Sequence, residues 1–257
     1  MIALNSFVAV TYKTEQEKLT AIGLAAELAL SLTNSPENFH FVLQVTNRGL
    51  MLQQNTTENA ESQKPLLLDF VSGDLAYRRR TLQHQDQQLL RAIGVKQASK
   101  PRVLDLTGGL AKDAFILACS GCAVTLVERS PILVAMVADA LARAQQESVL
   151  CEIVSRLQLI KQDSRDYVRD LAEAEYPDVV YLDPMYPGKK KSALVKKEMR
   201  MLRGLVGEDL DAAELLEPAI AIAKKVVVKR PRLAPCLTDK KPSAQIEGKS
   251  TRFDLYF

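Results

Sequence analysis

The stretch that decides the fold is Val179-Val180-Tyr181-Leu182-Asp183-Pro184-Met185-Tyr186. Its first four residues are apolar and rich in β-formers, so they predict a strand buried on both faces. Asp183 and Pro184 end that strand, because proline has no N–H for the ladder and fixes its own φ. Ligands of open α/β sheets bind at the carboxyl ends of the strands. We therefore interpret this corner as a site for an exocyclic amino group, with Tyr186 stacking on the base that carries it. The alternative is a plain strand-to-loop turn.

The sequence from Pro101 onward alternates between strand and helix patterns, which predicts an α/β fold with a parallel sheet. The expected strands are 102–107, 122–127, 157–160, 178–182 and 226–228, and a last hairpin joins 243–248 to 252–257. The first expected helix begins after the turn at 108–113 and ends at 118. Three further helices are expected over 131–146, 165–175 and 210–225. Pro218 should kink the last helix.

The first seventy or so residues predict a separate, smaller α/β unit. Its expected elements are a strand at 7–12, a helix at 15–32, and strands at 39–45, 49–52 and 66–71. A unit of this size can fold alone or as an appendage, and it carries no catalytic motif. We therefore expect two domains, a small one at 1–75 and a larger one at 76–257.

The composition is that of an ordinary soluble protein. The chain has 257 residues, 47% hydrophobic and 25% charged, with a formal net charge of +3, which permits an anionic partner without demonstrating one. The longest apolar stretch, 21–32, is broken by Glu27 and is too short to cross a membrane. The N-terminus has no signal-peptide pattern. We expect a cytoplasmic protein that does not associate with membranes.

Four cysteines and two histidines limit the possible metal chemistry. Cys119 and Cys122 form a C-x-x-C motif, which can be a redox pair or half of a zinc site. There is no second such motif, and His40 and His84 are too few to complete a tetrahedral site. We favour two small apolar residues near a helix-to-strand turn, and we expect no metal. The same shortage of histidine argues against a His-based triad.

Three other strand ends carry residues that suit a nucleoside cofactor. Asp105 and Gly108 follow the first expected strand, Glu128 ends the second, and Asp163-Ser164 follow the third. In a doubly wound sheet these ends converge on one crevice. Glu128 could accept both hydroxyls of a ribose, and Asp163-Ser164 could bind an adenine edge. Asp105 could instead serve as a brace of the turn.

The choice of cofactor depends on the turn Gly108-Gly109-Leu110-Ala111-Lys112-Asp113. It lacks the G-x-G-x-x-G spacing that seats a pyrophosphate on a helix N-terminus. Asp113 would repel a pyrophosphate but attract the ammonium group of a methionine moiety. This favours S-adenosylmethionine over a dinucleotide. Asp113 could instead be a first-turn carboxylate favoured by the helix dipole.

With these residues placed, the sequence resembles the RsmJ-type family of small-subunit ribosomal RNA guanine-N2 methyltransferases. The resemblance covers about the last two thirds of the chain. The matching stretches are 69–73 with Arg78-Arg79, 105–115, Glu128-Arg129, 158–160 with Asp163-Ser164, 179–187, 191–200, 226–231 and 252–254.

The resemblance implies a Rossmann-like methyltransferase fold with an antiparallel last strand and a smaller N-terminal domain. It implies S-adenosylmethionine as the donor and a guanine near the 3′ end of 16S ribosomal RNA as the acceptor, in free RNA or in the small subunit. The cofactor contacts it implies are Lys112, Asp113, Glu128, Arg129, Asp163, Ser164 and Asp183. The family usually has Gly, Arg and a Ser pair where this chain has Ala111, Lys112 and Asp163-Ser164.

Two groups of basic residues are candidates for binding RNA phosphates. The first is Arg78, Arg79 and Arg80, which could equally be a solvated face. The second follows Asp183-Pro184, which we call the acid-proline corner, in a segment that contains a single acid, Glu198. It comprises Lys189, Lys190, Lys191, Lys196, Lys197, Arg200 and Arg203. It could also be a solubilising helix face, but proximity in sequence to the base site favours RNA.

These residues suggest direct methyl transfer to the N2 amine of guanine, with Asp183, Pro184 and Tyr186 as the catalytic residues. Hydrogen bonds from the amine to the Asp183 carboxylate and the Pro184 carbonyl would localise the nitrogen lone pair and aim it. The proton could leave to Asp183 or to water. The same corner suits adenine N6 or a glutamine side chain. The sequence is also compatible with a non-catalytic RNA-binding assembly factor and, more distantly, with a nicotinamide dehydrogenase.

Overall fold

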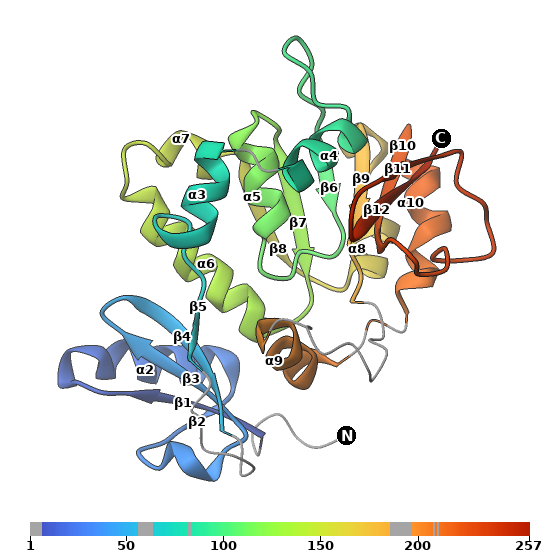
Figure 1. Ribbon diagram of the computed structural model, residues 1–257. Coiled ribbons are helices and arrows are strands. Elements are labelled where there is room, and N and C mark those ends of the chain that lie inside the picture. The colour runs from blue at the N-terminus through green and yellow to red at the C-terminus, as the bar shows by residue number, and fades with distance from the viewer. Residues whose placement is uncertain (1–6, 56–63, 82–83, 186–196, 208, 210) are drawn as a thin grey trace. The chain divides into compact units, whose positions relative to one another are not determined.

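The computed structural model describes residues 7–55, 64–81, 84–185, 197–207, 209 and 211–257. The chain forms two compact units (Figure 1). The first contains Met1–Leu68 and Gly188–Gly207, and the second contains Asp69–Pro187 and Glu208–Phe257. The first unit therefore takes two separate parts of the chain, and the boundary that we expect at residue 75 stays a prediction.

The first unit is built on a five-stranded sheet with the order β2-β1-β3-β4-β5. The strands are β1 (Val8–Tyr12), β2 (Ser31–Leu32), β3 (Phe41–Thr46), β4 (Gly49–Gln54) and β5 (Leu66–Leu67). The helices are α2 (Glu15–Leu28) and α9 (Lys197–Val206), with a short 3-10 turn, η1 (Pro36–Asn38). Helix α2 begins at a capping box formed by Thr14 and Glu17. It ends before the expected residue 32, because Ala29 adopts a left-handed conformation that stops the helix.

The second unit contains a seven-stranded sheet with the order β11-β12-β10-β9-β6-β7-β8. The strands are β6 (Val103–Asp105), β7 (Val124–Glu128), β8 (Leu157–Lys161), β9 (Val179–Leu182), β10 (Lys225–Pro231), β11 (Ala244–Glu247) and β12 (Thr251–Tyr256). Strands β6 to β10 are parallel, and β12 pairs antiparallel with β10 and with β11. This confirms the predicted Rossmann-like methyltransferase sheet, with an antiparallel strand and a C-terminal hairpin.

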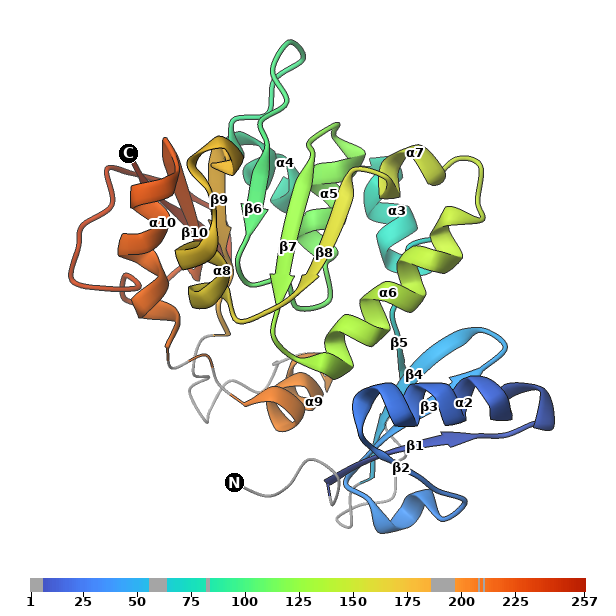
Figure 2. The ribbon, with the colours of Figure 1, turned by 180° about the vertical axis from the view of Figure 1, so that it is seen from behind.

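Helices cover both faces of this sheet. Helices α4 (His84–Ile93) and α5 (Lys112–Cys119) lie on the face seen in Figure 1, and α3 (Gly73–Thr81) packs against α5. Helices α8 (Ser164–Asp170) and α10 (Leu216–Ile222) lie on the opposite face (Figure 2). The remaining elements are α6 (Pro131–Gln145), α7 (Cys151–Val154), η2 (Glu173–Glu175) and η3 (Ala212–Leu215).

The side chains of each strand alternate between these two faces. Val180 and Leu182 join a buried apolar cluster with α8 and α10. Tyr181 and Lys229 therefore point to the opposite face, the side on which α5 begins. This alternation delivers polar groups from β9 and β10 to the first turn of α5.

Besides α2, three expected elements differ from the structure. The helix expected over 165–175 ends at Asp170 as α8, and Glu173–Glu175 form the separate 3-10 turn η2. The helix expected over 210–225 is divided into η3 and α10, and the break lies before Leu216 rather than at Pro218. Pro218 lies in the first turn of α10, where its missing N–H has no intrahelical partner to lose. The strand expected at 66–71 is only Leu66–Leu67, because Asp69 accepts hydrogen bonds from Val71 N and Ser72 Oγ and so forms a turn.

Candidate active site

Sheet register brings the predicted site residues to one edge. Asp105 pairs with Tyr181 across β6 and β9, and Tyr181 pairs with Val227 across β9 and β10. Strand β6 is also the point where the strand order reverses, since β7 and β8 lie on one side of it and β9 and β10 on the other. Crevices at such switch points are the usual ligand sites of open α/β sheets.

The acid-proline corner is fixed by hydrogen bonds on both sides of Pro184. Asp183 N donates to Thr107 Oγ1 at 2.7 Å, and Met185 N donates to Asp209 Oδ2 at 2.9 Å. Pro184 itself is buried. The backbone that carries the Pro184 carbonyl is therefore anchored on the β6 side by Thr107 and on the other side by Asp209. Tyr186, the predicted stacking residue, lies outside the described residues.

The carboxylates of Asp183 and Asp113 share one cation. Lys229 Nζ lies 2.7 Å from Asp183 Oδ2 and 2.7 Å from Asp113 Oδ2. The Tyr181 hydroxyl also donates to Asp113 Oδ2 at 2.7 Å, and Arg78 Nη2 lies 3.3 Å from Asp113 Oδ1. Asp113 is thus occupied by three protein donors, so its predicted role as partner of a methionine ammonium stays a prediction.

Arg78 continues this arrangement inward. Its guanidinium lies 2.5 Å from Asp86 Oδ1, and the Asp86 side chain is completely buried. Five charged groups of alternating sign therefore run from the interior to the site: Asp86, Arg78, Asp113, Lys229 and Asp183. We call these five residues the charge chain. The structure gives Arg78 two carboxylate partners, and its predicted contact with RNA stays a prediction.

The pKa values in the charge chain follow from burial and charge. Burial alone would raise the pKa of Asp113, but the charge of Lys229 outweighs it and holds the pKa below its ordinary value. Burial alone would lower the pKa of Lys229, but Asp113 and Asp183 raise it. Burial raises the pKa of Asp183, and Lys229 opposes that shift while Asp113 adds to it. Lys229 is therefore a permanent cation between two carboxyl groups.

Glu128 forms an acceptor site at the end of β7. Its Oε2 accepts Gly109 N at 2.8 Å and its Oε1 accepts Ser130 N at 2.7 Å. Each oxygen keeps a further acceptor position, and the side chain stays partly exposed. Gly108 allows the close approach of this turn, because a Cβ on it would lie 3.0 Å from the Val127 carbonyl oxygen. Burial raises the pKa of Glu128.

The turn between β6 and α5 has two residues in left-handed conformation. Gly109 has φ 51° and Ala111 has φ 55°. A left-handed conformation costs little for glycine and roughly 1–2 kcal/mol for a residue with a Cβ. Ala111 is therefore a position where glycine would cost less backbone strain. Lys112, a predicted cofactor contact, follows as the first residue of α5.

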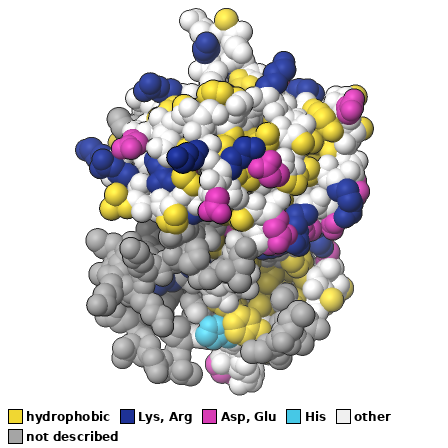
Figure 3. Space-filling model, turned by 90° about the vertical axis from the view of Figure 1, so that its right-hand side faces the viewer, with side chains coloured by type: hydrophobic (Ala, Val, Ile, Leu, Met, Phe, Trp, Pro, Cys, Tyr) yellow, Lys and Arg dark blue, Asp and Glu magenta, His cyan; other side chains and the backbone are white. Residues whose placement is uncertain are grey.

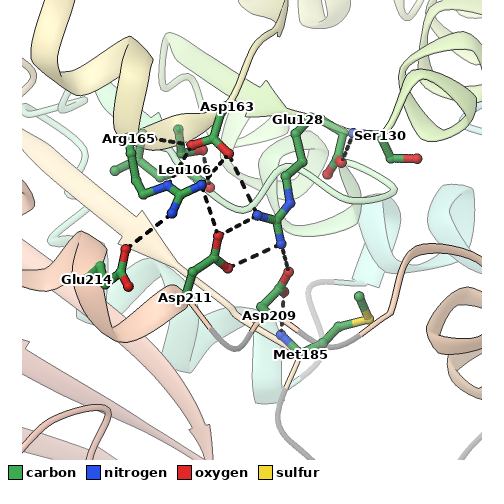
Figure 4. Close-up of polar contacts among 11 residues, drawn as sticks. Leu106, Glu128, Ser130, Asp163, Arg165, Met185, Asp209, Asp211 and Glu214 are labelled. Carbon is green, nitrogen blue, oxygen red and sulfur yellow. Dashed lines mark hydrogen bonds and ion pairs between the residues drawn. The ribbon is translucent and has the colours of Figure 1, made fainter. Parts of the chain in front are cut away.

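Arginines and acids form a second network near the end of β8 (Figure 4). Arg129 contacts Asp211 at 2.6 Å, Asp209 at 3.0 Å and Asp163 at 3.7 Å. Arg165 contacts Asp163 at 3.0 Å, and it also reaches Asp211 and Glu214. Asp209 thus connects this network to Met185 of the acid-proline corner.

Asp163 and Ser164 have well-defined local roles. Asp163 caps α8 by accepting Arg165 N at 3.0 Å. Ser164 Oγ donates to the Leu106 carbonyl at 2.7 Å and so connects the ends of β8 and β6. Their predicted contact with an adenine edge stays a prediction, as does the cofactor contact of Arg129.

Asp105 is a buried brace of the turn that follows β6, which was the alternative to a cofactor contact. Its Oδ1 accepts Thr107 N at 2.9 Å and Thr107 Oγ1 at 3.1 Å. Burial raises its pKa to about 7, and the nearby Asp113 and Asp183 carboxylates add to the shift.

This pKa predicts an unusual pH dependence of stability. The folded state binds the Asp105 proton more tightly than the unfolded state, so the free energy of unfolding falls as pH rises from about 4 to about 7. The loss is on the order of 4 kcal/mol, at about 1.4 kcal/mol per pH unit. Asp105→Asn keeps an acceptor for Thr107 and removes the charge. We expect it to be more stable than the parent at pH 8 and nearly equal at pH 4, measured by urea unfolding at both values. A gain of equal size at both pH values would contradict this.

The other predicted RNA contacts are only partly described. Arg80 is exposed on α3, whereas Arg79 is half-buried and its Nε has no hydrogen-bond partner. Arg200 is exposed on α9. The side chain of Lys197 and the whole of Lys189, Lys190, Lys191 and Lys196 lie outside the described residues. Their binding to RNA stays a prediction.

Four residues of the site were not predicted from the sequence. Lys229 lies in a stretch that matches the family and Arg165 lies in an expected helix, and neither position indicates a role in the site. Alternation along β10 predicts that Lys229 lies on the α5 face of the sheet. Its position along the strand, next to Asp183, depends on the register between β9 and β10. Asp209 and Asp211 lie in an irregular segment, and no sequence signal points to them.

The residues present fit S-adenosylmethionine better than a dinucleotide. Glu128 keeps acceptor positions for a ribose. The turn at 108–113 lacks the G-x-G-x-x-G spacing of a pyrophosphate site and carries an acid, Asp113. The net charge of these strand ends is negative, which suits a ligand carrying a sulfonium and an ammonium group. Over the described residues, no group of three or more His, Cys, Asp or Glu side chains could hold a metal ion. No described helix is long and apolar enough to cross a membrane.

Comparison with known proteins finds methyltransferases as relatives. A family model of SAM-dependent methyltransferases matches residues 24–257. The ribosomal RNA small subunit methyltransferase J of Thioalkalivibrio sulfidiphilus is 46% identical over 250 residues, which is 97% of this chain and 97% of the relative. The protein of the same name from Pseudomonas aeruginosa is 46% identical over 233 residues, covering 90% of this chain and 87% of the relative.

A solved structure has the same fold over nearly the whole chain. It is the crystal structure of a SAM-dependent methyltransferase from Neisseria gonorrhoeae, with a TM-score of 0.75 and 30% sequence identity. The match covers 96% of this chain and 95% of the other.

Proposed function

Because the chain belongs to the ribosomal RNA small subunit methyltransferase J family, we propose that it methylates the exocyclic N2 of a guanine in 16S ribosomal RNA. The chain is an S-adenosylmethionine-dependent ribosomal RNA methyltransferase, and the base and atom are our inference. The observation that carries this inference is that the acid-proline corner and the Glu128 acceptor site both bond to the turn that follows β6. Ribosomal RNA as substrate implies a reaction in the cytoplasm, on free RNA or on the small subunit.

The cofactor fits the strand ends of the second unit. When bound, S-adenosylmethionine supplies an electrophilic methyl group. Glu128 would hold the ribose hydroxyls, because its two oxygens are already oriented by Gly109 N and Ser130 N. Asp163 and Ser164 would lie on the adenine side, at the end of the neighbouring strand β8. Arg129 would hold the residues of the adenine side in place through its ion pairs with Asp209 and Asp211.

The acid-proline corner would hold the amine of the base. Asp183 Oδ2 is bonded to Lys229, and no described residue donates a hydrogen bond to Asp183 Oδ1. Oδ1 can therefore accept one N–H of the amine, and the Pro184 carbonyl can accept the other. The two bonds would localise the nitrogen lone pair and fix its direction, which lowers the barrier by positioning. Tyr186 would stack on the base, worth about 1–3 kcal/mol. The nitrogen then loses one proton, to Asp183 or to water.

The base must leave its stack to reach this corner, as base-modifying enzymes require. Phosphate contacts would hold the flanking RNA. On the face of the molecule shown in Figure 3, Lys and Arg side chains lie in small groups among acidic and hydrophobic ones. We propose that the basic residues at 189–203 make those contacts, because they follow the corner directly in sequence.

Arg200 offers a test of this RNA contact. It is exposed on α9. Removing one cation that contacts a phosphate reduces the magnitude of the slope of log K against log salt by about one. We expect Arg200→Ala to weaken binding of small-subunit RNA several-fold at low salt and to reduce the slope, measured by filter binding over a salt series. Lys240→Ala is the matched control, since Lys240 pairs with Glu217. Equal slopes for the two variants and the parent would contradict the RNA contact.

Two competing functions are separated by simple measurements. A nicotinamide dehydrogenase would bind NAD in calorimetry, whereas we expect binding of S-adenosylmethionine and none of NAD. A non-catalytic assembly factor would bind RNA without methylating it. Transfer of a labelled methyl group to purified small-subunit RNA tests our proposal against it. RNA that stays unlabelled both as free RNA and in small subunits would overturn the proposed function.

A further inference from the structure

Lys229 is the cation that pairs with Asp183 of the acid-proline corner, and the sequence gives this lysine no role. It lies on β10, one residue beyond Val228, which pairs with Leu182. Its Nζ therefore lies beside Asp183 and is shared with Asp113 at equal distances of 2.7 Å. No other described cation lies within 4.0 Å of the Asp183 carboxylate.

The charge chain becomes more exposed toward the base site. The exposed fraction of the side chain is 0% for Asp86, 15% for Arg78 and Asp113, 27% for Lys229 and 39% for Asp183. The inner members are therefore held in a low-dielectric interior, where charge pairing is strong and rotation is restricted. Asp183 is the only member with a substantially exposed carboxylate.

We propose that Lys229 is the positioning residue of Asp183: its ammonium group holds Oδ2 and keeps the carboxylate charged, with Oδ1 directed to the amine of the base. This inference rests on the proposed function and deepens it. Asp113, fixed by Arg78 and Tyr181, in turn holds Lys229.

The acids near Asp183 explain why it needs a positively charged partner such as Lys229. Asp183 lies near Asp113 and close to the end of β6 that carries Asp105, and both acids favour its protonated form. Arg230 adds a weaker favourable charge from β10. A protonated Asp183 would present an O–H donor, or a weaker acceptor, to an amine that itself donates. Lys229 opposes this because an adjacent opposite charge lowers a carboxyl pKa by about 1–3 units.

The test is the pH profile of kcat in Lys229→Met, which preserves side-chain length and removes the charge. We expect the acidic limb of the pH profile of kcat to move up by about two pH units, within the range of about 1–3 units that one adjacent charge contributes. At pH 6 kcat should fall about 100-fold, and at pH 9 at least a tenth of the parent rate should return. KM for S-adenosylmethionine should change less than about threefold. Lys225→Met is the matched control: Lys225 lies on the same strand, and its Nζ binds the carbonyls of Ala92 and Ile93. It should keep the parent pH profile.

A double variant tests whether Lys229 acts through Asp183. In the background of Asp183→Asn, Lys229→Met should cost less than a further twofold, because no carboxylate is left for Lys229 to keep charged. A further 100-fold loss, or a Lys229→Met profile parallel to that of the parent, would overturn the inference. If Lys229→Met does not fold, Lys229→Arg decides: it should keep the parent acidic limb and at least about a tenth of kcat. An inactive parent protein would instead overturn the proposed function, before any variant is compared.

Discussion

Asp183→Asn is expected to lower kcat by about 10³-fold while the affinity for S-adenosylmethionine changes less than about threefold. The amide differs from the carboxylate by one donor group. Lys229 can only donate, so it selects the amide oxygen at the position of Oδ2. The amide NH₂ then faces the amine of the base, and two donors meet where an acceptor is needed. Losses of 10²–10⁴-fold are typical when a positioned acceptor or base is removed.

The measurement is single-turnover methyl transfer to small-subunit RNA, with cofactor affinity from calorimetry. Asp178→Asn is the matched control. Asp178 immediately precedes the same strand, β9, at its opposite end, where it accepts a hydrogen bond from Arg102 N at 2.8 Å. We expect this variant to methylate at the parent rate. An Asp183→Asn protein that bound both ligands and kept full turnover would remove Asp183 from the mechanism.

Glu128→Gln is expected to weaken S-adenosylmethionine binding by about 100-fold and to change kcat at saturating cofactor less than about tenfold. Gly109 N and Ser130 N each need one of the two side-chain oxygens. A glutamine has one oxygen, so its NH₂ group faces one of these donors and a hydroxyl of the ribose loses its acceptor. A hydrogen bond to a charged group contributes roughly 1.5–3 kcal/mol, and 100-fold corresponds to about 2.7 kcal/mol.

Calorimetry with S-adenosylmethionine, followed by KM and kcat for the same cofactor, checks this separation of binding from turnover. Glu152→Gln is the control, because Glu152 is an exposed residue of α7 that pairs with Arg156. If Glu128→Gln bound the cofactor as tightly as this control, Glu128 would not hold the ribose.

Glu128→Gln should affect cofactor binding and Asp183→Asn should affect methyl transfer, because the two residues lie at the ends of different strands. Glu128 ends β7, on one side of the switch point, and Asp183 follows β9 on the other side. One variant should therefore change mainly binding and the other mainly turnover. A mutation that simply unfolded the second unit would reduce both.

Much of this fold could be predicted from local patterns. The strand that ends at Leu182 is apolar on both faces, which is typical of a parallel sheet covered by helices. Alternation of strands and helices then gives the order of elements. The position of Glu128 at the end of β7 was also predictable, because an acid at the end of the second strand has a defined place in this class of sheet, and its contact with a ribose stays a prediction. These features depend on residues close together in sequence.

The parts that could not be predicted depend on contacts distant in sequence. Lys229 meets Asp113 across 116 positions of the chain, and Arg129 meets Asp211 across 82. Arg78 lies in a run of three arginines that suggests a solvated or RNA-binding face, yet it turns inward to the buried Asp86. A charge run in sequence does not reveal which member has a buried partner, since that depends on how α3, α4 and α5 pack.

The measurement that tests the central claim most directly is the identity of the methylated atom. Unmodified 16S ribosomal RNA, free and in small subunits, would be incubated with labelled S-adenosylmethionine and the protein, then digested to nucleosides and mapped. We predict that the label is found in N2-methylguanosine at one position of this RNA, and that Asp183→Asn gives none. Label in another nucleoside such as N6-methyladenosine, or in protein, would contradict the assignment of the acid-proline corner to a guanine amine.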